Sequence, residues 1–138
     1  MRYLLDTNVL SETMRVKPAP QVLAWLESHP QGSCYVSVLT LGEIRNGAAS
    51  HPDAKRRAKL SAWLEQTLIP WFDQRTIAID TEIADRWGRL CAGTSRPLPA
   101  VDSLLAATAL AHGLTLVTRD AGFSDLPGLH VVNPWKMS

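Results

Sequence analysis

Acidic side chains lie close to the ends of several apolar segments of this sequence. The stretch YLLDTNVLS at residues 3–11 ends an apolar run at Asp6 and continues with Thr7 and Asn8. The acids that lie just past an apolar run, or in the expected first turn of a helix, are Asp6, Glu43, Asp80, Asp102 and Asp120. Crowded carboxylates repel one another, and burial adds to the cost, so such a cluster needs a positive charge to offset it. Oxygen ligands without His or Cys favour Mg²⁺ or Mn²⁺ over Zn²⁺.

Each of these acids also has a purely structural interpretation. Glu43 has the spacing to complete a capping box, and Asp80 suits the N-cap of the helix that follows it, which is the interpretation we favour for that residue. Asp102 would complement a helix dipole, and Asp120 would occupy a turn before a glycine. Composition and spacing alone do not decide whether Asp6 or Asp80 belongs to a site.

Short runs of β-forming residues alternate with segments of helical periodicity. The runs predict strands at 2–5, 34–38, 76–79, 114–117 and 129–132. The periodicity predicts one or two helical turns at 8–15, and helices at about 19–28, 40–49, 60–71, 83–91 and 99–112. Thr40 is the expected N-cap of the helix at 40–49, and Pro99 is expected in the first turn of the last helix. One continuous apolar stripe is expected along 60–71: Leu60, Trp63, Leu64, Thr67, Leu68 and Trp71.

This order of elements predicts a single α/β domain over residues 1–138. Continuous apolar strands that alternate with helices favour a mostly parallel sheet of about five strands, with helices on both faces. In such sheets, ligands bind beyond the carboxyl ends of the strands, and the helix starts lie at the same edge. We therefore expect the acids to converge at that edge.

The composition excludes several classes of protein. The net charge is +1, so the chain as a whole has no strong attraction for nucleic acid. No apolar run reaches the roughly 18 residues of a membrane span, and the N-terminus does not resemble a signal peptide, so we expect a cytoplasmic protein. Cys34 and Cys91 have no CxxC spacing and are expected to be packed thiols.

Four sequence blocks together resemble the PIN-domain ribonucleases, and most closely the VapC-type toxins of bacterial toxin–antitoxin pairs. They are YLLDTNVLS (3–11), VSVLTLGEIRNG (36–47), LPAVDSLLAATALAHGLTLVTRD (98–120) and the closing VVNPW. The resemblance implies that Asp6, Glu43, Asp102 and Asp120 form a catalytic site for Mg²⁺ or Mn²⁺, and it leaves out Asp80. Thr7, Asn8 and Thr118 match polar residues that surround this site in the family. The segment after Asp120 is compact, so Asp125 competes weakly for the fourth place.

The resemblance also implies a function and partners. The chain would be a metal-dependent endoribonuclease that forms a homodimer and is inhibited by an antitoxin protein, with which it builds a larger assembly. Candidate RNA contacts are Arg119 beside the last acid and the basic cluster Lys55, Arg56 and Arg57. The alternative for that cluster is a solvated helix face.

Two other functional classes compete with this interpretation. One is a phosphoryl-transfer or receiver-like signalling domain with an acidic Mg²⁺ pocket, for which Asp80 and Lys136 would be the phosphoacceptor and the lysine. A haloacid-dehalogenase-like phosphatase of this class needs a second Asp where this chain has Asn8. A receiver domain needs paired acids after the first strand, which this chain lacks. The other is a non-catalytic binding module, which the presence of all four acids disfavours.

Overall fold

A five-stranded parallel sheet forms the centre of the molecule in the computed structural model, which describes residues 1–136. The strands are β1 (Tyr3–Leu5), β2 (Cys34–Ser37), β3 (Thr76–Ile77), β4 (Thr115–Val117) and β5 (Val131–Val132). Their order in the sheet is β3-β2-β1-β4-β5, and every neighbouring pair is parallel. The predicted α/β class and number of strands are confirmed, and the sheet is entirely parallel.

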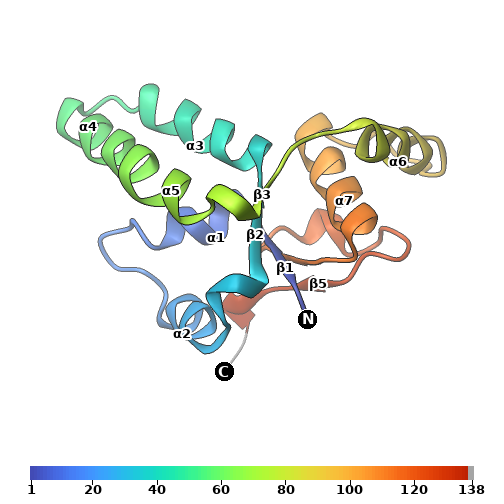
Figure 1. The fold of residues 1–138 in the computed structure, drawn as a ribbon, viewed down its shortest axis with the longest axis horizontal. Coiled ribbons are helices and arrows are strands. Elements are labelled where there is room, and N and C mark those ends of the chain that lie inside the picture. The colour runs from blue at the N-terminus through green and yellow to red at the C-terminus, as the bar shows by residue number, and fades with distance from the viewer. Residues whose placement is uncertain (137–138) are drawn as a thin grey trace.

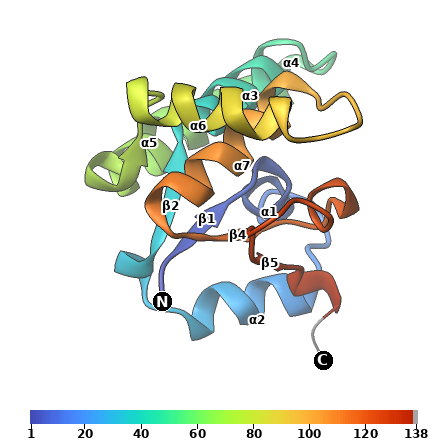
Figure 2. The ribbon, with the colours of Figure 1, turned by 90° about the vertical axis from the view of Figure 1, so that its right-hand side faces the viewer.

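Helices cover both faces of this sheet. They are α1 (Thr7–Glu12), α2 (Pro20–Ser28), α3 (Val38–Ala49), α4 (Ala54–Trp63), α5 (Ile69–Trp71), α6 (Thr81–Ala92) and α7 (Ala100–His112). Figure 1 shows α3, α4 and α5 on one side of the strands and α6 with α7 on the other. In the turned view, α2 lies across the sheet from α7 (Figure 2).

Side chains that point alternately to the two faces of the sheet produce two hydrophobic cores. Leu5 packs with residues of α1, α2 and α3 on one face, whereas Leu4 packs with Leu105 and other residues of α7 on the opposite face. Successive side chains of a strand point to opposite faces, so the apolar run of β1 serves both cores. Since β1 and β4 are central and buried on both faces, their carboxyl ends are held rigidly side by side.

The start of α3 differs from the prediction. Its N-cap is Ser37, whose hydroxyl accepts the N–H of Leu39 at 3.1 Å, and not Thr40. The helix begins as soon as β2 stops pairing with β3, at the register Ser37 with Ile77. Glu43 therefore lies in the second turn of α3, and the predicted capping box with Thr40 is wrong.

The predicted continuous helix at 60–71 is also interrupted. The helix α4 passes into a π-helical segment, η2 (Leu64–Leu68), before α5. Pro70 has no N–H and cannot donate the regular helical hydrogen bond, which gives a local reason for the change of winding. Within the expected stripe, Leu64 and Leu68 are buried, whereas Trp71 is 48% exposed.

Both ends of the last helix, α7, lie close to where the sequence predicts them. Gly113 ends α7 in the left-handed conformation with φ +64°, as the pair His112-Gly113 predicts. Pro99 lies at the N-cap of α7, one residue before the predicted first turn.

Both cysteines are free thiols, as expected. None of the helices within residues 1–136 has the length and hydropathy to span a bilayer.

Asp80 is the N-cap of α6. Its Oδ1 accepts the N–H of Ile83 at 2.9 Å, which confirms the structural interpretation of this acid. Ile83 itself is fully buried, so the cap holds the first turn of α6 against the core.

We predict that Asp80→Ala lowers the free energy of unfolding by about 1 kcal/mol, because the N–H of Ile83 loses its acceptor. Asp80→Asn keeps an acceptor oxygen and should cost less. Urea denaturation of the two variants beside the wild type measures both values. Equal stability of Asp80→Ala and the wild type would contradict the assignment of the cap.

Candidate functional site

Asp6 lies at the carboxyl end of β1, where it is 7% exposed. Its backbone N–H donates to the carbonyl of Val117 at 3.0 Å and so continues the pairing of β1 with β4. Its carboxylate accepts the backbone N–H of Thr7 on Oδ1 and the hydroxyl of Thr118 on Oδ2, both at 2.7 Å. These bonds fix the orientation of the carboxylate.

The Thr118 hydroxyl joins the ends of the two central strands. Besides donating to Asp6, its oxygen accepts the backbone N–H of Asp120 at 3.0 Å and the Asn8 side-chain amide at 3.1 Å. The same Asn8 amide lies 3.5 Å from Asp6 Oδ2, a much weaker contact. Thr118 therefore sets the position of both Asp6 and Asp120.

Glu43 approaches the site from α3. Its Oε1 accepts the hydroxyl of Thr7 at 2.7 Å, so Thr7 contacts Asp6 through its backbone and Glu43 through its side chain. The helices α1 and α3 also contact each other. Glu43 thus reaches the site even though it lies one turn later in its helix than predicted.

Asp102, the third residue of α7, faces the same site from the other side of the sheet. It lines a pocket of about 200 Å³ together with Asp120, Ser103 and Gly122. The Ser103 hydroxyl is held by the indole N–H of Trp87 at 2.8 Å. The pocket therefore has one wall from α7 and another from the segment after β4.

Charge couples these acids to one another. Burial is the main cause that raises the pKa of Asp6; the hydrogen bonds from Thr118 and Thr7 lower this pKa, and the charges of Glu43 and Asp120 raise it. The pKa of Asp102 is also raised, first by burial and then by the charges of Asp120 and Asp6. Glu43 and Asp120 therefore influence Asp6, and Asp120 and Asp6 influence Asp102. Asp80 takes no part in these effects and caps α6 instead.

The donor set fits a hard divalent cation. Its acids supply oxygen only, and their mutual repulsion would be relieved by positive charge. The Asn8 amide adds an oxygen, Oδ1, that is buried without a hydrogen-bond partner among the described residues. Within residues 1–136, no three His, Cys, Asp or Glu side chains are close enough together to hold a metal ion by themselves. Mg²⁺ commonly keeps several waters and uses only one or two carboxylates, so this spacing is compatible with such an ion.

Some of the predicted RNA-contacting residues already contact other parts of the protein. Arg119 places its guanidinium 4.7 Å from the ring centre of Trp135. Arg56 donates to the carbonyl of Met14, and Arg57 donates to the carbonyl of His51 at 2.7 Å. Lys55 is exposed. Two members of the basic cluster thus hold backbone segments in place, which the sequence spacing did not reveal.

Asp125, the weak competitor for the fourth place, forms an ion pair instead of joining the other acids. Its carboxylate binds the guanidinium of Arg96, with contacts of 2.7 Å and 3.1 Å. That contact lowers the pKa of Asp125, in contrast to the raised pKa values of Asp6 and Asp102. The sequence offers Arg96 only as one of several unranked candidates for contacting RNA. It does not reveal the two contacts of Arg96, because the partners lie 26 and 29 residues away and no local spacing signals them.

We predict that Asp102→Asn raises the melting temperature of the metal-free protein at neutral pH. A raised pKa in the folded state means that stability is present in full below the unfolded pKa and is lost as pH rises through the folded pKa. The difference between variant and wild type should therefore be small near pH 4 and grow toward pH 7.

Thermal unfolding in EDTA at several pH values measures this difference. Asp73→Asn is the matched control, because Asp73 is an exposed acid outside the site. If the difference in melting temperature between Asp102→Asn and the wild type does not change with pH, ionisation of Asp102 does not destabilise the folded protein.

Comparison with known proteins places the chain in a family. The sequence model described as "PIN domain" matches residues 3–129. A plasmid stability protein, StbB, of Pseudomonas syringae is 39% identical, with 96% of this chain and 98% of that protein covered. Toxin FitB of Neisseria gonorrhoeae is 36% identical, covering 96% and 97% of the two chains. A VapC ribonuclease, Y4jK, of Sinorhizobium fredii is 34% identical, again with 96% and 97% covered.

A solved structure supports the same assignment. The crystal structure of FitAcB from Neisseria gonorrhoeae superposes with a TM-score of 0.90 at 36% identity, covering 98% of this chain and 99% of that chain. The matched family model spans both central strands and all four acids of the site. On this evidence, the chain belongs to the PIN-domain family.

Proposed function

We propose that this protein is a metal-dependent endoribonuclease, the toxin of a toxin–antitoxin pair, and that Asp6, Glu43, Asp102 and Asp120 form its catalytic site with Mg²⁺ or Mn²⁺. The observation that carries the proposal is geometric: hydrogen bonds of Thr7 and Thr118 link Asp6 to Glu43 and to Asp120 at the carboxyl edge of a parallel sheet. Asp102 shares a pocket with Asp120. Relatives that match almost the whole chain are named VapC ribonuclease and Toxin FitB, which supports the reaction and the biological role.

Asp6, Asp102 and Asp120 would hold the ion partly through bound waters, because they are not close enough together to bind it by themselves. Asp6 is oriented by Thr7 and Thr118, and Asp120 is attached to the same Thr118 hydroxyl through its backbone. Asp102 approaches from the opposite wall of the pocket. When bound, the ion would lower the pKa of the attacking water and withdraw charge from the phosphate oxygens.

Glu43 is the candidate proton acceptor. The Thr7 hydroxyl donates to its Oε1 and so restrains the carboxylate beside Asp6. A general base must lie within hydrogen-bond reach of the proton that it accepts, and this restraint keeps Glu43 at the edge of the acid cluster.

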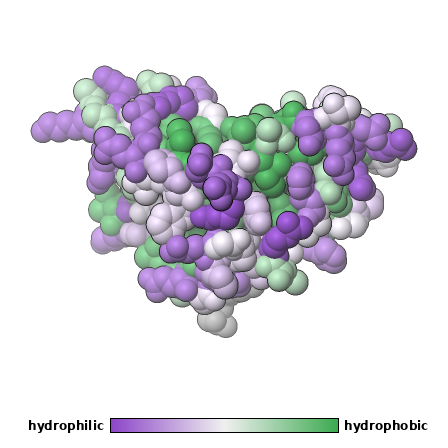
Figure 3. Space-filling model, in the orientation of Figure 1, coloured by the Kyte–Doolittle hydropathy of each residue, from purple (hydrophilic) through white to green (hydrophobic). Residues whose placement is uncertain are grey.

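A protein partner would cover apolar surface that the fold leaves open. Ile69 and Trp71 are 42% and 48% exposed, and a groove of about 340 Å³ lies between Trp71, Leu26 and Leu10. The space-filling view also shows a hollow with hydrophobic walls between the helices α3–α5 and the pair α6 and α7 (Figure 3). Exposed apolar surface of this kind supports two partners: a second copy of the chain in a homodimer, and an antitoxin that blocks the site. The protein would act in the cytoplasm, where RNA is found.

The receiver-like alternative is not favoured. A phosphoacceptor needs a free carboxylate, and Asp80 Oδ1 is already used as the N-cap of α6. The strand before Asp80 is also the outer strand of the sheet, β3, which is not adjacent to β1.

We predict that the wild type cleaves structured RNA in the presence of Mg²⁺ or Mn²⁺, and that Asp6→Ala lowers the cleavage rate at least about 100-fold because the ion loses a ligand. Gel analysis of labelled RNA measures the rate. Asp80→Asn is the matched control, since it changes an acid beyond the site and should keep the activity. Full activity of Asp6→Ala, or activity of the wild type in EDTA, would contradict the proposal.

We predict that Lys55→Ala weakens RNA binding. The slope of the logarithm of the binding constant against the logarithm of the salt concentration should become shallower by the amount expected for the loss of about one phosphate contact. Lys55 is the member of the basic cluster to change, because Arg56 and Arg57 hold backbone carbonyls. Fluorescence anisotropy at several salt concentrations, in the inactive Asp6→Ala background, measures the slope. An unchanged slope would remove Lys55 from the RNA interface.

A further inference from the structure

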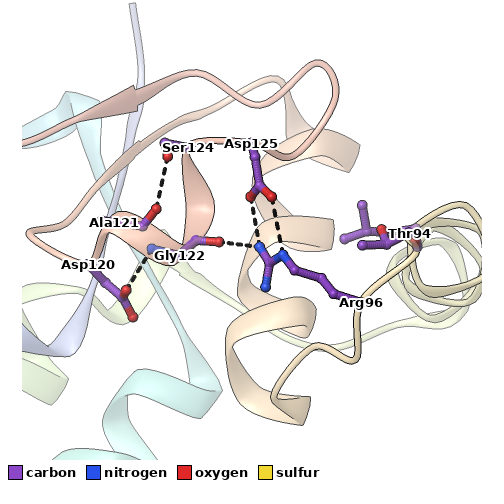
Figure 4. Close-up of polar contacts among 8 residues, drawn as sticks. Thr94, Arg96, Asp120, Ala121, Gly122, Ser124 and Asp125 are labelled. Carbon is purple, nitrogen blue, oxygen red and sulfur yellow. Dashed lines mark hydrogen bonds and ion pairs between the residues drawn. The ribbon is translucent and has the colours of Figure 1, made fainter.

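Arg96 connects the two segments that carry Asp102 and Asp120. It lies in the loop between α6 and α7, which leads directly to Asp102. Its Nη2 donates to the carbonyl of Gly122 at 2.7 Å, in the 3₁₀ turn (Ala121–Phe123) that follows Asp120 (Figure 4). Neither segment belongs to the sheet, so strand pairing does not set their relative position.

The backbone of Gly122 links this contact to the acid. Its N–H donates to Asp120 Oδ1 at 2.8 Å, while its carbonyl accepts Arg96. A Cβ atom at position 122 would lie 3.2 Å from the same Oδ1 and would crowd the carboxylate. The turn thus approaches Asp120 closely because residue 122 is a glycine, and Arg96 is bound to that turn.

Asp125 keeps the guanidinium of Arg96 in place. It accepts Nε at 3.1 Å and Nη2 at 2.7 Å, a two-point contact that fixes the plane of the group. Arg96 lines the same pocket as Asp102 and Asp120. The pairing with Asp125 therefore holds the positive charge away from those acids, where it would compete with a cation.

We propose that Arg96 is a positioning residue: through the backbone of Gly122, it fixes the Asp120 carboxylate opposite Asp102 in the geometry that receives the divalent ion. This inference rests on the proposed function. The ion pair is exposed, with 38% of the Arg96 side chain and 63% of the Asp125 side chain accessible. Exposed pairs contribute little to the stability of a fold, so the effect of Arg96 is local.

The Mn²⁺ affinity distinguishes positioning from charge. If Arg96 acted through its charge alone, the Arg96→Gln variant would bind the cation more tightly than the wild type, because a nearby positive charge is lost. Loss of positioning weakens cation binding, and we expect about a tenfold increase in the Mn²⁺ dissociation constant, as for other residues that orient metal ligands. Arg96→Lys keeps the charge without the planar fork and should also bind Mn²⁺ more weakly.

Electron paramagnetic resonance titration of Mn²⁺ measures these constants. Arg89→Gln is the matched control, because Arg89 forms an exposed ion pair with Asp85 on α6 and should leave the affinity unchanged. Circular dichroism and melting temperature establish that the variants are folded. If Arg96→Gln is unfolded, the test uses Arg96→Lys in its place.

Amide hydrogen exchange of Gly122 in the metal-free protein, followed by NMR, provides a readout that does not need the ion. We expect faster exchange in Arg96→Gln than in the wild type or Arg89→Gln. Unchanged Gly122 exchange, or Mn²⁺ binding by Arg96→Gln as tight as that of the wild type, overturns the inference. If the wild type binds no Mn²⁺, the proposed function fails instead, and the exchange of Gly122 still decides the role of Arg96.

Discussion

Repulsion between partly buried carboxylates is the constraint on which the rest of this structure depends. Asp6 stands at the end of a strand buried on both faces, and Glu43 and Asp120 place further negative charge beside it. Asp102 adds to the same site from α7. A fold gains nothing from assembling such charges unless a cation uses them. Under the proposed function, the arrangement exchanges stability for a site that would attract a divalent ion and, with it, a phosphate.

Neutral and paired groups hold the acids in place without cancelling their charge. The hydroxyls of Thr118 and Thr7 orient Asp6, Asp120 and Glu43 by hydrogen bonds. The nearest arginine that lines the pocket, Arg96, is bound by a carboxylate outside the cluster. Glu43 and Asp102 lie inside helices, and Asp6 and Asp120 lie close to the ends of β1 and β4, so regular elements restrain all four side chains.

Local patterns predicted the sheet, its parallel strands and the cap at Asp80, since strand runs and N-caps are decided by neighbouring residues. The residues alone could not separate Asp6 from Asp80; the choice came from the resemblance of four sequence blocks. Ser37 and Thr40 are both good N-caps, and strand pairing at the end of β2 selected Ser37. The contacts of Arg96 were beyond prediction, because they join segments that only the folded chain brings together.

Anomalous X-ray diffraction from crystals soaked in Mn²⁺ tests the central claim most directly. The account predicts one or two strong peaks at the carboxyl edge of the sheet, about 2 Å from oxygens of at least one of Asp6, Asp102 and Asp120. The peak should be lost in Asp6→Asn crystals treated in the same way. Absence of any peak at this edge in the wild type, at Mn²⁺ concentrations that support RNA cleavage in solution, would contradict the account.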